Sequence, residues 1–225
     1  MDFPENVFLN FHAHQQIPAE NEIVIQSKFL HENLIAQKSD KIFFTSGLHP
    51  WHADLLSIYE IRKRLEQLVN SNSVIAIGET GIDKLKGPDL EIQLRVFREH
   101  VQIAEEKRLP VIVHSVKTHN EILKIKKETS SNVPWVIHNF NGSKQMAFDL
   151  IDNGFYLSLS YQIGNNKSRL SNYLKDLPIE RLFLETDDYD IRIEELYILT
   201  SQKIGIELDV LKKQIVLNLK EFVNE

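Results

Sequence analysis

Val74-Ile-Ala-Ile-Gly-Glu79 is a short apolar run that ends in a glycine and a carboxylate. Four consecutive apolar residues without polar alternation are typical of a parallel strand that is buried on both faces. Seven further short runs, rich in β-branched and aromatic residues and bounded by turn signals, are found at residues 7–11, 23–26, 41–46, 111–113, 135–137, 155–159 and 182–184. The sequence therefore predicts eight strands.

Amphipathic helical stretches lie between most of these runs. They are predicted at Ser27–Lys38, Leu55–Val69 (with Asp54 as N-cap), Asp89–Lys107, Thr118–Glu128, Ser143–Asp152 and Ser168–Lys175, with two more helices from Glu194 onward that are split near Gly205. Strands that alternate with helices indicate a (β/α)8 barrel of the TIM type; an open doubly wound sheet is the alternative. Only Gln15–Glu22 connects the first two strands, which is too short for a crossover helix, so we expect the barrel to be truncated there.

The bulk composition fits one soluble α/β domain spanning residues 1–225. The chain has no cysteine, which excludes disulfides and thiolate metal sites. The net charge of -6 argues against a protein that coats nucleic acid, but not against an enzyme that binds a few phosphates in a cleft. No secretory signal or membrane-spanning run is recognised, so we expect a cytoplasmic protein with no membrane partner, as a monomer or weak oligomer.

Metal-capable side chains occur at the carboxyl ends of the predicted strands. These residues are His12 and His14 after the first strand, Glu79 after the fourth, His114 after the fifth, His138 after the sixth and Asp187 after the eighth. Because all carboxyl ends of a parallel barrel open on one face, the six side chains are predicted to converge there as metal ligands. Imidazoles with carboxylates suit Zn²⁺, Mn²⁺ or Fe²⁺ better than an all-oxygen Mg²⁺ site.

Each of these residues also has an ordinary structural interpretation. A single histidine after a strand is commonly a hydrogen-bonding loop residue, and Asp187 could cap a helix. The metal-site hypothesis rests on the six residues taken together, because residues placed independently of one another would not all follow the carboxyl ends of strands. His49 could either donate to a substrate phosphate or pack beside Trp51. The remaining histidines are interpreted as non-ligands, with His31 and His100 inside helices and His52 and His119 off the pattern.

The order of these motifs resembles the TatD family of metal-dependent deoxyribonucleases, over about Val7 to Asp187. The matching segments are Asn10-Phe-His-Ala-His14, Gly47-Leu-His-Pro50, Ile77-Gly-Glu-Thr-Gly-Ile-Asp83, Pro110-Val-Ile-Val-His-Ser115, Val136-Ile-His-Asn-Phe-Asn-Gly-Ser143 and Leu184-Glu-Thr-Asp187. The chain departs from the family pattern at Val116, where Arg is common, at Asn139 and Asn141, which replace Cys and Ser, and at Asp188-Tyr-Asp-Ile191.

The resemblance implies a phosphodiesterase or deoxyribonuclease that uses metal-activated water and acts on DNA. It implies two divalent metal ions (Zn, Mn, Fe or Mg), with one held by His12, His14, Glu79 and Asp187. Glu79, which bridges the metals in the family, His114 and His138 would hold the other. Asp187 and Glu79 would then be catalytic, with Asp187 as general base, and His49 would bind substrate.

Two other functions remain open from the sequence. The first is amide or carboxyl-ester hydrolysis of the amidohydrolase type, although many of those enzymes bridge their metals with a modified lysine on strand four, where this chain has Glu79. The second is a non-catalytic metal-binding barrel, which the missing arginine and the short loops would favour. Assays with phosphoesters and with amides or carboxyl esters distinguish the first alternative from a phosphodiesterase. Tight metal binding without turnover of any substrate identifies the second.

Overall fold

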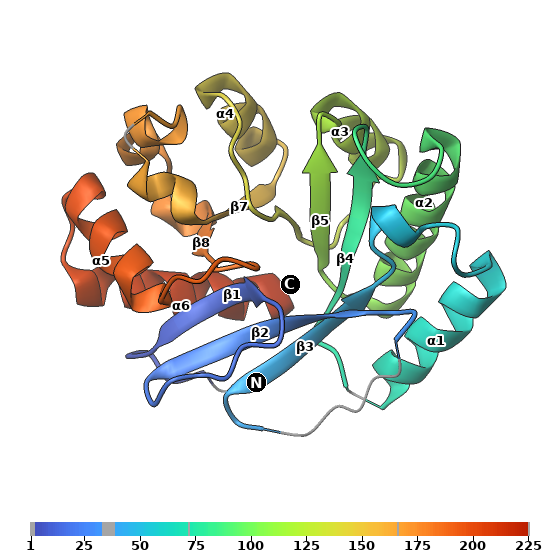
Figure 1. Ribbon diagram of the computed structural model, residues 1–225, viewed down its shortest axis with the longest axis horizontal. Helices are drawn as coiled ribbons and strands as arrows, with labels where there is room; N and C mark the ends of the chain where they lie inside the picture. The colour runs from blue at the N-terminus through green and yellow to red at the C-terminus, as the bar shows by residue number, and fades with distance from the viewer. Residues whose placement is uncertain (1–2, 33–38, 72, 166, 225) are drawn as a thin grey trace. The chain divides into compact units, whose positions relative to one another are not determined.

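The computed structural model describes residues 3–32, 39–71, 73–165 and 167–224. Its eight strands follow one another in one sheet in chain order, β1 to β8 (Figure 1), and every register that is defined is parallel. This strand order is the topology of a (β/α)8 barrel. The predicted fold class is therefore confirmed. None of the described helices is long and apolar enough to cross a membrane.

Two compact units make up the chain, and the first consists of Met1–Gln26, Ser39–Ile42 and His138–Glu225. Its strands are β1 (Phe8–Ala13), β2 (Glu22–Phe29, which continues into the second unit), β7 (Phe155–Leu159) and β8 (Leu182–Leu184). β1 pairs with β2, β7 pairs with β8, and a bridge between Ala13 and Asp187 joins the end of β1 to the segment after β8. The helices are α4 (Lys144–Asp152), α5 (Ile193–Ile204) and α6 (Leu208–Asn224).

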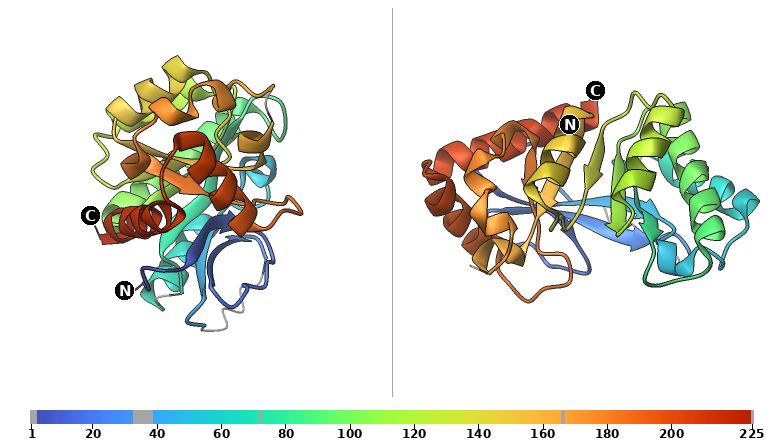
Figure 2. Two further views of the ribbon diagram at one scale, coloured as in Figure 1. Left: turned by 90° about the vertical axis from the view of Figure 1, so that its left-hand side faces the viewer. Right: turned by 90° about the horizontal axis from the view of Figure 1, so that it is seen from above.

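Aromatic residues fill the interior of the first unit. Phe11 on β1 stacks on Phe183 of β8 with ring centroids 3.8 Å apart, and Phe222 of α6 meets both rings edge-on. α6 accordingly packs against β1 and β8 (Figure 2). Burial of such large side chains stabilises a domain by about 2–3 kcal/mol each, which holds the ends of β1 and β8 in place.

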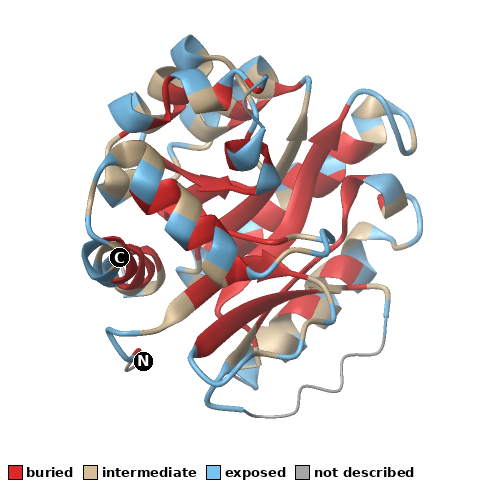
Figure 3. Cartoon of the chain, turned by 60° about the vertical axis from the view of Figure 1, so that its left-hand side comes forward, coloured by how far each residue is buried: buried red, intermediate tan, exposed pale blue. Residues whose placement is uncertain are grey.

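The second unit consists of Ser27–Lys38 and Phe43–Ile137. Its strands are β3 (Ile42–Gly47, whose first residue belongs to the first unit), β4 (Ala76–Asp83), β5 (Val111–Val116) and β6 (Trp135–Ile137), paired in that order. Its helices are α1 (Ile58–Asn70), α2 (Leu90–Lys107) and α3 (His119–Glu128), and α2 packs along β4. The strands are buried over most of their length (Figure 3), as the apolar runs predicted.

The connections contain short 3₁₀ turns, some of which replace a predicted helix. These turns are η1 (Pro50–His52), η2 (Tyr161–Gly164), η3 (Leu170–Asn172), η4 (Leu174–Asp176) and η5 (Ile179–Arg181). The helix predicted over Ser168–Lys175 is wrong, because the N–H groups of Asn172 and Tyr173 donate to the carbonyls three residues back, as in 3₁₀ geometry.

The helix predicted over Ser27–Lys38 is also wrong in the part that the structure describes. β2 continues to Phe29 and is followed by a turn, while residues 33–38 lie outside the described residues. The backbone here bonds to a neighbouring strand instead of to itself: Leu30 N–H donates to the Gly47 carbonyl, and Ser46 Oγ donates to the Lys28 carbonyl. The truncation of the first β/α connection is confirmed, since residues 14–21 contain no helix.

Other helices start close to their predicted positions. α1 begins later than predicted, because Ser57 and not Asp54 is its N-cap, in a capping box with Glu60. α2, α3 and α4 follow Asp89, Thr118 and Ser143 as predicted, and α5 and α6 are separated at Gly205.

Candidate functional site

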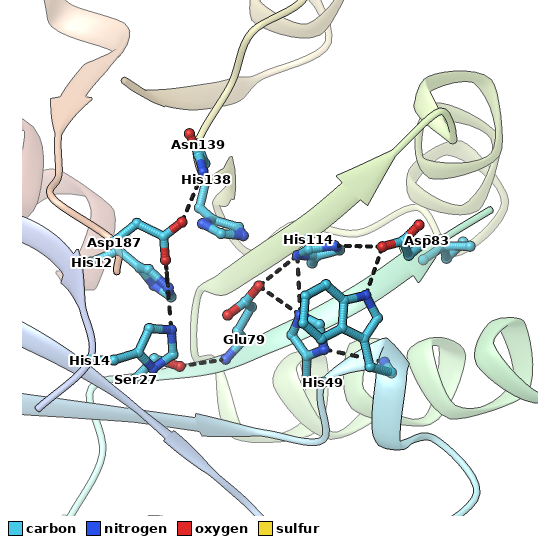
Figure 4. A network of polar contacts seen from close by, with 12 residues as sticks. His12, His14, Ser27, His49, Glu79, Asp83, His114, His138, Asn139 and Asp187 are labelled. Carbon is cyan, nitrogen blue, oxygen red and sulfur yellow. Dashed lines mark hydrogen bonds and ion pairs between the residues drawn. The ribbon is translucent and has the colours of Figure 1, made fainter. Parts of the chain in front are cut away.

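The predicted metal ligands fall into two groups, one in each unit, and Figure 4 draws both. In the first unit, His12 lies on β1, His14 follows that strand, and Asp187 follows β8. Asp187 Oδ1 is 3.9 Å from His12 Nε2 and 3.7 Å from His14 Nε2. Asp187 N–H also donates to the His12 carbonyl at 2.9 Å, which fixes the two segments to each other. The structure thus brings three predicted ligands together.

His138, the fourth predicted ligand in this unit, is held by a carboxylate that the sequence interpretation missed. Glu185 is fully buried, and its Oε1 is 3.3 Å from His138 Nδ1 and accepts from the Asn139 N–H at 2.8 Å. A buried carboxylate beside an imidazole is the usual arrangement that orients a metal-ligating histidine. The available signal in the sequence was a charged residue directly after the apolar run Leu182–Leu184.

Asn139 orients the Asp187 carboxylate. Its Nδ2 donates to Asp187 Oδ2 at 2.8 Å, and its Oδ1 accepts from Gln162 Nε2 at 2.8 Å. Both Asn139 and Asp187 have left-handed backbone conformations, with φ of 46° and 53°. Asn and Asp tolerate this region better than most residues. The departure from cysteine at position 139 therefore supplies both the backbone bend and the amide that holds Asp187.

The second unit groups His49, Glu79 and His114. Glu79 Oε1 is 2.7 Å from His114 Nδ1 and 3.1 Å from His49 Nε2, and these two nitrogens are 3.2 Å apart. Glu79 and His49 are buried and His114 is partly exposed. His49, predicted as a substrate-binding residue, thus lies within the donor group itself. A Cβ at Gly47 would lie 2.6 Å from the Glu79 carbonyl, so this close approach of β3 to β4 requires glycine.

Asp83 is a second residue that the sequence interpretation did not single out. Its Oδ2 accepts from the Trp51 indole N–H at 2.7 Å and is 3.4 Å from His114 Nε2. Burial acts to raise the pKa of Asp83, but hydrogen bonds from Trp51 and the Leu85 N–H, together with His114, hold that pKa below its ordinary value. Asp83 is therefore an ionised partner that orients the His114 ring.

Strand lengths differ slightly from the predicted pattern. His12, Glu79 and His114 lie within β1, β4 and β5, whereas they were predicted to follow those strands. The parallel ladder continues past the apolar run, as the pairing of Gly81 with His114 shows. The prediction that all six ligands converge on one face stays a prediction, because the groupings described above are each confined to one unit.

The donor atoms fit divalent metal ions. Ligands of one ion at about 2.1 Å are separated from each other by roughly 3 Å, close to the separations among His49, Glu79 and His114. The distances from Asp187 Oδ1 to His14 Nε2 (3.7 Å) and to His12 Nε2 (3.9 Å) are too long for direct hydrogen bonds. Glu185 Oε2 is buried, and no described residue donates a hydrogen bond to it. A buried carboxylate oxygen of this kind is costly without a cation or donor nearby.

A cavity of about 670 Å³ opens beside His14 and Asp187 in the first unit. Acidic residues outnumber the basic Arg192 in its lining, which also includes Tyr189. The acidic residues apart from Asp187 are Glu20, Glu22, Asp188, Asp190 and Glu194. Metal ions bound next to it would be the largest local positive charges.

His100 holds the backbone next to His49 in place. It is fully buried on α2, and its Nε2 accepts from the Leu48 N–H at 3.0 Å, so its Nδ1 carries the proton and donates to the Val96 carbonyl at 2.8 Å. His100 lies inside a helix, as predicted, although its full burial was not foreseen, whereas His31, predicted inside a helix, lies in a turn. Burial lowers the pKa of His100 to about 4 from 6.5.

We expect this histidine to make folding sensitive to mild acid. Below pH 6.5 the unfolded chain binds the proton more readily than the folded chain. The contribution of neutral His100 to the free energy of unfolding is therefore complete above pH 6.5. It is lost as the pH falls toward 4, and this loss lowers the free energy of unfolding by about 3 kcal/mol. Urea unfolding between pH 7.5 and 4.5 measures it, with His100→Gln as the non-titrating comparison. Equal pH dependence in both proteins would contradict this assignment.

Comparison with protein families identifies one matching model, described as TatD related DNase, over residues 10–197. An uncharacterized metal-dependent hydrolase of Buchnera aphidicola is 32% identical over 72% of this chain and 64% of its own length. The uncharacterized metal-dependent hydrolase YcfH of Escherichia coli K12 is 32% identical over 71% of this chain and 60% of its own length. The matched region thus spans less than two thirds of these relatives.

Solved structures support the fold. The crystal structure of YjjV, a TatD homologue from Escherichia coli K12, superposes with a TM-score of 0.83 at 21% identity, covering 99% of this chain and 100% of YjjV. A TatD family hydrolase from Entamoeba histolytica has a TM-score of 0.76 at 19% identity, covering 97% and 98% of the two chains.

Proposed function

We propose, because this chain belongs to the TatD-related DNase family, that it is a metal-dependent hydrolase which cleaves phosphoester bonds in nucleic acid. The observation that carries the proposal is the grouping of Glu79 Oε1 with His49 Nε2 and His114 Nδ1 at 2.7–3.2 Å. An acidic ligand at this position, where many amidohydrolases have a modified lysine, favours phosphoesters over amides.

The ligand roles follow the two groups. His12, His14 and Asp187 would hold one divalent ion, with His138 oriented by Glu185 beside them. Glu79 and His114 would hold another, with His49 in reach of the same position. Sharing of Glu79 and His138 across the units, as the family resemblance implies, remains part of the proposal. When bound, such ions lower the pKa of water and stabilise charge on phosphoryl oxygens.

Asp187 is proposed as the general base. Asn139 Nδ2 holds its Oδ2, which leaves Oδ1 directed toward His12 and His14. The carboxylate is thus fixed in orientation before it accepts a proton from the attacking water, and a fixed base contributes typically 10²–10⁴-fold. In the other group, Asp83 holds the His114 ring so that Nδ1 faces Glu79.

The test is a substrate panel with the protein purified without chelator. Bis-p-nitrophenyl phosphate and a single-stranded oligonucleotide are compared with p-nitrophenyl acetate and an amide, in the presence of Mn²⁺, Zn²⁺ or Mg²⁺ and after chelation. We expect metal-stimulated cleavage of the phosphoesters. Cleavage of the acetate or amide alone would establish the amidohydrolase alternative, and metal binding without turnover of any substrate would establish a non-catalytic barrel.

A further inference from the structure

Two exposed tyrosines lie against each other close to Asp187. Tyr161 begins η2 after β7 and Tyr189 follows β8, and these two strands pair with each other (Figure 1). Their ring centroids are 4.0 Å apart, and the two residues are 39% and 41% exposed. Exposed aromatic faces of this kind offer a stacking surface for a planar group.

Tyr161 also forms one wall of a second cavity, of about 420 Å³, in the same unit. The other walls are polar or basic and include Asn141, Gln162, Lys167 and Arg169. The volume is in the range of small-molecule sites. The two cations give this cavity a charge opposite to that of the acidic cavity beside His14.

Gln162 supplies an independent sign that a ligand belongs here. It is 7% exposed, and its Nε2 donates to Asn139 Oδ1. Its amide orientation is fixed, because Asn139 uses Nδ2 to donate to Asp187 and has only Oδ1 left to accept. Gln162 Oε1 is therefore an acceptor, and within the described residues nothing donates to it. A buried acceptor of this kind calls for a ligand that carries an N–H or O–H group.

One ligand class combines a planar ring, an N–H edge and a negative charge. Nucleobases stack on aromatic side chains and carry N–H donors on their edges, and the adjoining phosphate is attracted to Lys and Arg. A nucleic-acid strand would be repelled by Glu20, Glu22 and Glu194 of the acidic cavity, whereas Lys167 and Arg169 of the second cavity attract it.

We propose, building on the proposed function, that the tyrosine pair and this second cavity form a subsite for the nucleotide next to the cleaved phosphoester in single-stranded nucleic acid. The base stacks on Tyr161 and Tyr189 and its N–H edge donates to Gln162 Oε1. The following phosphate lies between Lys167 and Arg169. Asn139 then connects this subsite to Asp187 through hydrogen bonds on both sides.

The experiment measures equilibrium binding of a fluorescein-labelled phosphorothioate tetranucleotide, which resists hydrolysis, to the protein as purified. We expect Tyr161→Leu to weaken binding roughly 5- to 100-fold, the range for loss of one base-stacking contact, and Tyr161→Phe to bind like the wild type. Arg169→Gln should weaken binding and reduce its salt dependence. The matched controls Tyr59→Leu and Lys213→Gln change exposed residues on α1 and α6 and should have no effect.

Two comparisons separate the possible results. A tetranucleotide with abasic sugars should bind the wild type as weakly as the normal one binds Tyr161→Leu; if it binds as tightly as the normal one, the stacking role is wrong. Unchanged affinity in both Tyr161→Leu and Arg169→Gln, or an equal loss in the controls, overturns the subsite. If the wild type cleaves phosphoesters but these variants bind normally, only the subsite fails; tyrosine-dependent binding without any cleavage means that only the proposed function fails.

Discussion

Replacement of Asp187 by asparagine is expected to reduce kcat for a phosphodiester substrate by about 10³-fold, within the range for loss of a positioned general base. The amide keeps the size of the side chain and retains one oxygen that can accept from Asn139 Nδ2, as Asp187 Oδ2 does. It removes the negative charge that faces His12 and His14, and with it the ability to accept a proton.

Steady-state kinetics at saturating Mn²⁺ measure this effect, so that a weaker metal site is not mistaken for a lost base. Asp152→Asn is the matched control, because it makes the same chemical change at an exposed carboxylate that ends α4 in the same unit. Retention of full turnover by Asp187→Asn would remove Asp187 from the mechanism, whereas a loss that disappears at high metal concentration would restrict it to metal binding.

The strands and most helices could be predicted because their signals are local. Short β-branched apolar runs such as Val111–Val113 that are bounded by turn signals are typical of strands. The N-cap residues Ser143 and Thr118 are adjacent to the helices they start. The helix predicted from Ser27 failed because its backbone partners, such as Gly47, lie distant in sequence. Hydrophobic periodicity cannot reveal whether a backbone N–H will donate to a carbonyl within its own segment, as in a helix, or to a carbonyl of a neighbouring strand.

The candidate ligands of the site could also be predicted from the sequence, but the residues that orient them could not. The six ligand candidates were found because strand ends are visible in the sequence, and the structure groups each of them with at least one other. Glu185 and Asp83 were missed because their importance comes from contacts with His138 and His114, which are 47 and 31 residues away. The prediction that His49 binds substrate stays a prediction. Its approach to Glu79 was not foreseen, because that contact depends on how closely β3 and β4 pack.

Glu79→Gln is expected to lower the affinity of the second unit's site for a divalent ion by at least about 100-fold, the upper range measured for loss of residues that merely support metal ligands. The substitution keeps the side-chain shape and removes the negative charge of the carboxylate whose Oε1 faces both His49 Nε2 and His114 Nδ1. Two imidazole nitrogens 3.2 Å apart then remain without a charged ligand beside them. A hard or borderline divalent cation binds neutral nitrogens alone less tightly.

Metal analysis of protein purified without chelator measures the outcome. The wild type is expected to carry about two equivalents of a transition metal, as in two-metal hydrolytic sites, and Glu79→Gln at least one fewer. Glu91→Gln, an exposed position in the first turn of α2, is the control for loss of one negative charge. If Glu79→Gln holds as much metal as the wild type with the same affinity, the group around Glu79 is a hydrogen-bonded cluster and the ions bind elsewhere. If the ions leave and hydrolysis continues, the metal-dependent mechanism itself is wrong.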